Sequence, residues 1–533
     1  MVKTVGKPDT TETVERKSIL FRVKSRVLSD GNLTKKASLN AAASLIDQGV
    51  RTIIKLAINP FLLTSLGDSL FGTWNVLQSL IGQATPATGR PGEALKWTVA
   101  HDQASTNQEE KRRSVGSAVA VWLLFLPLLI PLGGALAWFS PVWLDLPSSS
   151  YATVRLTAAI LLLNIVIAGL ALLPQAVLHG ENLAYKRLGL STSVVVFANL
   201  FVVVAVYLRA GIVGMAVAAT TTTLLTGGVY MYIASSRIEW FGIVRPSRAD
   251  VRGFAGLSGW FLVWNFVMQL MRGGDIVVLG VAGSPVLATT YALARYLPQT
   301  ITLASAMVIV AIMPGLGGLI GAGDLQRVAR VRNETTTIIW LITTVAGATV
   351  LLWEESFLRL WVGAQYYPGT GEMLAIMALV LQFALIRTDS NIIDLTLKIR
   401  RKVLLGAMST GLSVGLGWFL LSVLDMGIVG LVVGFIAGRA ILSLGYPAMV
   451  GNLVGFPLHL QLKAIVRPGA ATAFLFLCAT VLSNALDVSS WIQLGVSAAV
   501  SAPVIGVFAF FTGLSSRSRR FVQNRILRAV RRT

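Results

Sequence analysis

Charged side chains inside long apolar runs are the residues of this sequence best placed to do chemistry. The basic ones are Arg51, Lys55, Arg272, Arg295, Arg387 and Arg439, and the acidic ones are Asp47, Asp275, Asp389 and Asp394. A charge in hydrocarbon costs on the order of 2.5–3.5 kcal/mol even on a lenient insertion scale. These residues must therefore face other protein groups or a water-filled cavity, where the bases can bind an anion and the acids can titrate.

Two arrangements of these charges agree with the sequence. In one, the bases line an anion-binding cavity, with Arg51, Lys55 and Arg272 as its main members and Arg295, Arg387 and Arg439 as further ones. In the other, they form buried ion pairs, Arg272 with Asp275 and Arg387 with Asp389 or Asp394. The spacing of Arg51 and Lys55, four residues apart on one helical face, favours the cavity for that pair. Asp275, Asp389 and Asp394 are candidates for coupling to a proton or Na⁺ gradient.

The elements that must position these charges are membrane-spanning helices. Hydrophobic residues make up 54% of the 533 residues and charged residues only 13%, about half the share of a soluble domain. A spanning helix needs about 20 mostly apolar residues, and fourteen runs qualify: 38–63, 70–88, 115–140, 151–177, 188–208, 211–234, 254–282, 286–319, 335–353, 372–396, 403–424, 427–449, 469–486 and 489–513. The expected fold is an all-α polytopic membrane protein with no soluble catalytic domain.

The distribution of basic residues predicts the orientation of these spans. With the N-terminus in the cytoplasm, 36 of the 45 Lys and Arg fall in cytoplasmic segments, six lie inside spans, and the other side receives only Arg155, Arg209 and Arg359. The positive-inside rule explains this bias, and with it the net charge of +21, so nucleic-acid binding is not expected. We expect a multi-pass protein of the bacterial cytoplasmic (inner) membrane with both termini in the cytoplasm. Residues 1–36 lack the apolar core of a cleavable signal peptide.

The spans divide into two sets of six followed by two more. We expect a basic tail (1–36), an N-terminal six-helix bundle (37–236), an inter-bundle loop (237–253), a second six-helix bundle (254–450), two further helices (451–514) and a basic tail (515–533). Each bundle starts with a charged helix that leads to a glycine-containing external turn, a weak internal repeat of the kind found in secondary transporters. The loop 89–114 is expected to be a solvated helix or hairpin, and 354–371 an external loop. Pro60, Pro298 and Pro314 are places where helices can bend.

The sequence gives little support for an enzyme or for a cofactor-binding protein. The sequence contains no GxxxxGK[ST] phosphate-binding loop and no Cys/His pattern with metal-ligand spacing, and its single cysteine, Cys478, can form no internal disulfide. Gly280-Val281-Ala282-Gly283 lacks the strand–helix context of a dinucleotide site, so we interpret it as close helix packing. We expect no cofactor, no metal and no enzyme.

Three segments resemble a known family. Asn59–Trp74 (NPFLLTSLGDSLFGTW) is similar to the family's turn between spans 1 and 2; Asp275–Gly280 with Tyr291–Ala294 is similar to its span 7–8 motif; and Ala311–Pro314 is similar to its span 8 motif. The chain resembles the multidrug/oligosaccharidyl-lipid/polysaccharide (MOP) exporter superfamily over about residues 37–450, and within it the bacterial Wzx-type polysaccharide flippases. The resemblance implies two six-helix bundles around a central cavity.

The resemblance also implies a function. The chain would be a flippase that moves an undecaprenyl-pyrophosphate-linked oligosaccharide from the cytoplasmic to the outer leaflet by alternating access, for cell-surface polysaccharide synthesis such as lipopolysaccharide or exopolysaccharide. Its partners would be this substrate, membrane lipids, H⁺ or Na⁺, and a glycan polymerase with other pathway proteins. An ion-coupled multidrug exporter or a lipid II flippase is the alternative. A multidrug exporter of cations would need an acidic cavity, which six basic against four acidic buried residues disfavour. A membrane glycan polymerase or ligase is a third alternative, disfavoured by the short external loops.

Overall fold

The protein is a bundle of long helices in the computed structural model, which describes residues 31–101, 107–181, 190–396, 400–516, 518–520 and 522–523. Eleven helices in this part of the chain are long and apolar enough to cross a membrane, and three shorter apolar helices accompany them. All fourteen expected spans are helical, so the all-α polytopic prediction is confirmed. Most of the two basic tails, and the side chain of Asp47, lie outside the described residues.

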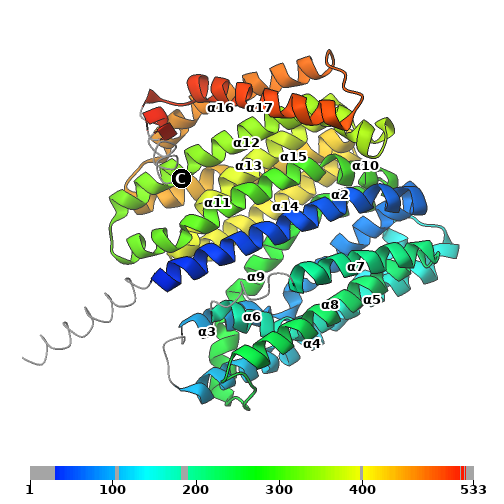
Figure 1. Ribbon diagram of the computed structural model, residues 1–533, viewed down its shortest axis with the longest axis vertical. Coiled ribbons are helices and arrows are strands. Elements are labelled where there is room, and N and C mark those ends of the chain that lie inside the picture. The colour runs from blue at the N-terminus through cyan, green and yellow to red at the C-terminus, as the bar shows by residue number, and fades with distance from the viewer. Residues whose placement is uncertain are drawn as a thin grey trace, which may run out of the picture.

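The helices form two groups (Figure 1). The N-terminal group contains the second half of α2 (Gly31–Gly82), η1 (Thr85–Thr88), α3 (Pro91–His101), α4 (Gln108–Trp143), η3 (Ser148–Ser150), α5 (Tyr151–Ala171), α6 (Leu173–Gly180), α7 (Leu190–Tyr207) and α8 (Gly211–Arg237). The first half of α2 lies along the other group. Helix α9 (Arg248–Val278) follows the linker 238–247 and passes between the groups, continuing into the π-helical turn η5 (Leu279–Gly283).

The second group contains α10 (Pro285–Ala294), α11 (Tyr296–Gly321), α12 (Leu325–Trp361), η6 (Ala364–Tyr366), α13 (Thr370–Leu395), α14 (Arg400–Ser422) and α15 (Gly427–Val454). The last two helices, α16 (Leu458–Ser483) and α17 (Trp491–Gly513), pack on α12 at the outer edge of this group. The two helices expected after the second bundle thus lie together at its edge, whereas the division of the earlier spans into two sets of six stays a prediction.

Helix breaks occur at three sites that matter for the function. Spans 1 and 2 are the two halves of α2, separated at Gly67, whose φ of 75° and ψ of 167° leave the helical region. Residues other than glycine rarely adopt a positive φ, so glycine suits this corner. Span 8 is divided at Arg295 into α10 and α11, three residues before Pro298. Span 4 is divided at Leu172, directly before Leu173 and Pro174.

Two loop predictions need correction. The segment 89–114 is not simply solvated, because α3 buries Leu95 and Val99 completely and packs on α6. The apolar face of this short helix belongs to the second hydrophobic core. The expected external loop 354–371 is also shorter, because α12 continues to Trp361 and buries Glu354. Tryptophan and phenylalanine at the end of α12 extend the apolar face past the charged pair Glu354–Glu355.

Candidate functional site

Arg51 and Lys55 lie on the first half of α2, and both side chains are exposed. Neither takes part in an ion pair or side-chain hydrogen bond with the residues that the structure describes, and the two positive charges repel each other across one helical turn. Two unneutralised cations on one face agree with the anion-binding arrangement.

A proline fixes where this pair lies. Pro60 has no amide hydrogen, so the carbonyl of Leu56, four residues earlier, loses its helical donor. The indole Nε1 of Trp361 in α12 donates to this freed oxygen at 2.6 Å, and the Tyr296 hydroxyl donates to the carbonyl of Thr52 one turn earlier. The rings of Tyr296 and Trp361 pack with centroids 4.8 Å apart. The first helix of the N-terminal half is thereby held against the second bundle, with Arg51 and Lys55 beside the contact.

A second cationic set joins the two bundles. Arg272 on α9 is exposed, and its charge is close enough to those of Arg90 and Arg387 to be repelled by both. Arg387 lies half-buried on α13, and Arg90 follows η1 in the N-terminal bundle, where it donates to Asn265 Oδ1 on α9 at 2.9 Å. No carboxylate among the described residues forms an ion pair with Arg272 or Arg387. The structure thus brings Arg272 and Arg387 together, and adds Arg90, which the sequence analysis had placed in a loop.

A polar pocket opens beside Arg90. It has a volume of about 590 Å³ and lies between η1, α3, α5 and α6. Its wall includes Asn164 and Gln175, and Asn164 Oδ1 is buried without a hydrogen-bond partner. Glu93 also lines the pocket and offsets part of the charge of Arg90. An unsatisfied buried amide oxygen costs about 1–3 kcal/mol, a cost that a hydrogen bond from a donor would relieve.

Arg295 and Arg439, in contrast, belong to a buried network. Arg295 Nη1 donates to Asp275 Oδ2 at 2.6 Å, and the Tyr291 hydroxyl donates to the same oxygen at 2.8 Å. Arg439 is 4% exposed, donates to the carbonyl of Met271 at 2.6 Å and lies between two phenylalanine rings. The expected pairing of Asp275 with Arg272 is therefore wrong, because Arg295 at the α10–α11 break reaches the carboxylate instead.

The other two aspartates are also paired with bases that the sequence analysis had placed in loops. Arg332 donates from Nε and Nη2 to the two oxygens of Asp389, both at 2.6 Å, in a buried fork between α12 and α13. Lys402 contacts Asp394 at 2.6 Å and is itself fully buried under the Trp264 ring. Neither aspartate pairs with Arg387, which corrects that expectation. Helices α12 and α14 begin before the predicted spans 335–353 and 403–424. Arg332 and Lys402 therefore lie on these helices and are buried.

Close contacts join the bundles at the end where the span 1–2 and 7–8 turns meet. A Cβ on Gly72 would lie 1.8 Å from the Pro285 carbonyl oxygen, so only glycine allows this approach of α2 to α10. Directly after the Gly67 break, the Asp68 carbonyl accepts from Thr289 at 2.7 Å and its carboxylate accepts from the Tyr366 hydroxyl. Burial and this hydrogen bond raise the pKa of Tyr366 to about 12, so the phenol remains a donor at physiological pH. Gly280 packs equally closely on Val76, as expected for its motif.

An apolar groove runs along the outer side of the second group. Helices α11, α12 and α17 enclose about 920 Å³, lined by residues such as Leu297, Ile301, Val345 and Phe510. Thr300, Thr349 and Gln523 add its few polar groups. Leu297 of the groove directly follows Tyr296, whose hydroxyl donates to the Thr52 carbonyl on α2.

Comparison of the sequence with known proteins gives one distant relative. The chain is 21% identical over 521 residues to the uncharacterized membrane protein EpsK of Bacillus subtilis, covering 92% of this chain and 98% of EpsK. No family model matches the chain.

Solved structures share the fold. The lipid II flippase MurJ, in an inward closed conformation, aligns with a TM-score of 0.64 and 12% identity over 88% of this chain and 97% of its own. A multidrug resistance MATE family transporter of the MOP superfamily, in an inward-facing conformation, aligns with a TM-score of 0.61 and 14% identity over 76% of this chain and 95% of its own. The chain therefore has the fold of MOP-superfamily transporters, as the resemblance of its motifs implied.

Proposed function

We propose that this protein is a flippase that moves an oligosaccharide linked to undecaprenyl pyrophosphate from the cytoplasmic to the outer leaflet of a bacterial inner membrane. The observation that carries the proposal is the set of cations that form no ion pair with a carboxylate of the described residues: Arg51 and Lys55 on α2, and Arg272 and Arg387 between the bundles. The pyrophosphate that links the lipid to the glycan is a dianion that must leave water to cross the membrane. Guanidinium groups bind phosphate through charge-assisted, bidentate hydrogen bonds and lower that barrier.

Two further features fit the other parts of such a substrate. The pocket beside Arg90 offers amide and hydroxyl groups, including the unsatisfied Asn164 oxygen, which suit sugar hydroxyls. The groove of α11, α12 and α17 is almost wholly apolar and suits a prenyl chain. The product would be used at the outer face, where we expect a glycan polymerase and other pathway proteins to act.

A cation exporter fits these observations less well. Cationic drugs require free carboxylates in the cavity, yet Asp275, Asp389 and Asp394 each pair with a base. A proton- or Na⁺-coupling role for these three aspartates stays a proposal, and it would require that their pairs open during transport. A lipid II flippase would bind the same pyrophosphate, so only the glycan distinguishes it from the function proposed here.

Deletion of the gene in its host tests the proposal. The expected result is loss of surface polysaccharide with accumulation of the lipid-linked oligosaccharide inside, restored by the wild-type gene. Arrest of peptidoglycan synthesis would point to lipid II instead. Increased sensitivity to cationic drugs with normal polysaccharide would point to a drug exporter.

A further inference from the structure

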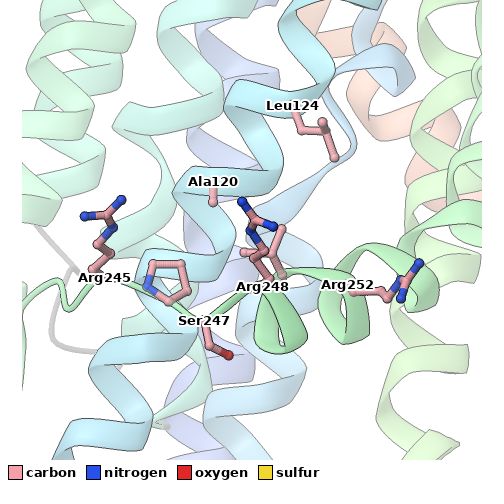
Figure 2. A pocket seen from close by; sticks show the side chains of 8 residues that line it. Ala120, Leu124, Arg245, Ser247, Arg248 and Arg252 are labelled. Atoms are coloured by element: carbon pink, nitrogen blue, oxygen red, sulfur yellow. The ribbon is translucent and has the colours of Figure 1, made fainter.

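The linker between the bundles and the first turns of α9 form a further basic site. Arg245, Arg248 and Arg252 are exposed and surround a pocket of about 770 Å³. Figure 2 shows these arginines along the segment that enters α9, with Ala120 and Leu124 on the neighbouring helix α4. No described carboxylate forms an ion pair with any of the three.

Local contacts fix the linker against α4. Val244 N donates to the carbonyl of Arg112 at 3.3 Å, and Arg112 Nε donates to the carbonyl of Trp240 at 2.7 Å. A Cβ on Gly116 would lie 2.1 Å from the Val244 carbonyl oxygen, so the backbone of the linker lies directly on the helix. The pocket is therefore built on packed backbone, which fixes the segment that carries its three arginines.

The start of α9 adds to the positive potential. Ser247 and Asp250 cap the helix reciprocally, with Asp250 N donating to Ser247 Oγ at 3.1 Å and Ser247 N donating to Asp250 Oδ2 at 2.9 Å. The hydrogen bonds from Ser247 hold the pKa of Asp250 below its ordinary value, so this carboxylate is ionised. Three arginines against one capping carboxylate leave the pocket positive, and the helix N-terminus has the same sign.

The wall opposite the arginines is apolar and faces outward. Leu124, which lines the pocket, is 62% exposed, and the preceding residue of α4, Leu123, is 53% exposed. Exposed leucines of this kind on a spanning helix lie against acyl chains. The pocket thus combines a basic rim with a lipid-facing apolar wall, at the arginine-rich end that is predicted to be cytoplasmic. We propose that this pocket binds the phosphate headgroup of an anionic phospholipid of the cytoplasmic leaflet, whose acyl chains lie along Leu124.

Binding here would join the two bundles at their connection. The headgroup would contact Arg245 on the linker and Arg248 and Arg252 on α9, while the acyl chains contact α4 of the N-terminal bundle. Basic pockets on the cytoplasmic side of membrane proteins have the charge and position that anionic headgroups require. The site is independent of the transported substrate, so its test needs no transport assay.

Lipid binding to the purified full-length protein tests the proposal. Native mass spectrometry would compare dioleoyl-phosphatidylglycerol with dioleoyl-phosphatidylcholine, for the wild type and for R245Q/R248Q/R252Q. A triple variant of other exposed arginines, R327Q/R330Q/R401Q, is the matched control. We expect preferential binding of phosphatidylglycerol, weakened on the order of a hundredfold in the pocket variant and retained in the control.

Three results would overturn the proposal. These are equal binding of the two lipids by the wild type, equal losses in the two triple variants, and saturation of the site by undecaprenyl pyrophosphate with no binding of phosphatidylglycerol. The last result would assign the pocket to the substrate. Because all six substituted arginines are exposed, elution of each variant as a single peak in size-exclusion chromatography would verify that folding is intact.

Discussion

The basic residues within the apolar spans differ in their surroundings. Arg295 pairs with Asp275, and Arg439 is buried and donates to the Met271 carbonyl. Arg51, Lys55, Arg272 and Arg387 form no ion pair with a described carboxylate, although Arg272 Nε donates to the Met268 carbonyl at 3.3 Å. The sequence could show that charges lie in the spans, but could not choose between pairing and a cavity. The choice depends on which helices are neighbours. It also depends on Arg332 and Lys402, which lie just outside the predicted spans and pair with Asp389 and Asp394.

Removal of one unpaired cation should impair transport without unfolding the protein. We expect Arg272→Ala and Arg51→Ala each to reduce glycan export at least about tenfold, since a hydrogen bond to a charged group contributes about 1.5–3 kcal/mol. Lysine at either position should retain part of the activity, because it keeps the charge and loses the bidentate geometry. Surface polysaccharide per amount of membrane protein is the measurement, with the exposed Arg237→Ala as control. Full activity of both alanine variants would remove these residues from the site.

Removal of one partner of a buried ion pair should, in contrast, destabilise the protein. Asp389→Ala leaves Arg332 buried and uncompensated, which costs about 3–5 kcal/mol. We expect a clear fall in the midpoint of thermal unfolding of the purified protein. Arg332→Met combined with Asp389→Leu should recover most of the loss, since no buried charge remains. An unchanged midpoint in the single variant would mean that the pair is hydrated.

At the scale of the helices, the geometry is determined by helix breaks and by close contacts between neighbouring helices. Gly67 and the proline-freed carbonyl of Leu56 could be anticipated from glycine and proline in an apolar run. The donor to that carbonyl, Trp361, could not, because it comes from a residue about 300 positions away. The same applies to Asp68, whose partners lie on α10 and η6.

A side chain at Gly72 should prevent closure of the α2–α10 contact. Gly72→Val places carbon where the Pro285 carbonyl lies, so we expect the bundles to separate at this end. The measurement is labelling of a cysteine at Thr289, which is fully buried at this contact, by a membrane-impermeant thiol reagent, and it should be faster in the variant. Gly411→Val is the control, because a Cβ there meets no atom within 4 Å. Equal labelling rates would show that this contact does not control access.

Loss of the indole hydrogen-bond donor of Trp361 should weaken the contact between α12 and the first half of α2. Trp361→Phe keeps the ring packing against Tyr296 and leaves the Leu56 carbonyl unsatisfied, at a cost of about 1–3 kcal/mol. We expect a lower thermal midpoint and reduced export, measured on the same preparations. Leu56 keeps its carbonyl in every variant of its side chain, so Leu56→Ile should not reproduce the export defect.

For the whole molecule, composition and charge bias predict the fold class and the order of helices, because membranes permit few architectures. Composition and charge bias do not predict at which end the two bundles are in contact. In the structure the Gly72, Asp68 and Gly280 contacts close the end of the span 1–2 and 7–8 turns, while Arg272 and Arg387 remain unpaired between the bundles. With the predicted orientation, the closed end would be the outer one, which suits the proposed loading of a substrate from the cytoplasm. Substrate can shift the balance only by its differential affinity for the two states.

The orientation of the protein in the membrane is predicted from the bias of basic residues alone. A cysteine at Ser247, in the linker, should be protected from an impermeant reagent added outside, and one at Gln365, beside η6, should react. Permeabilised cells provide the control, because both positions should then react. Reaction at both positions in intact cells would mean that the topology is wrong.

The most direct test of the central claim is translocation by the purified protein in proteoliposomes. A fluorescent oligosaccharide on undecaprenyl pyrophosphate would be added to one leaflet, and its transfer measured as protection from a glycosidase outside. We predict protein-dependent transfer that falls at least about tenfold in Arg272→Ala and persists in Arg237→Ala. Equal transfer by wild type, Arg272→Ala and protein-free vesicles would contradict the account.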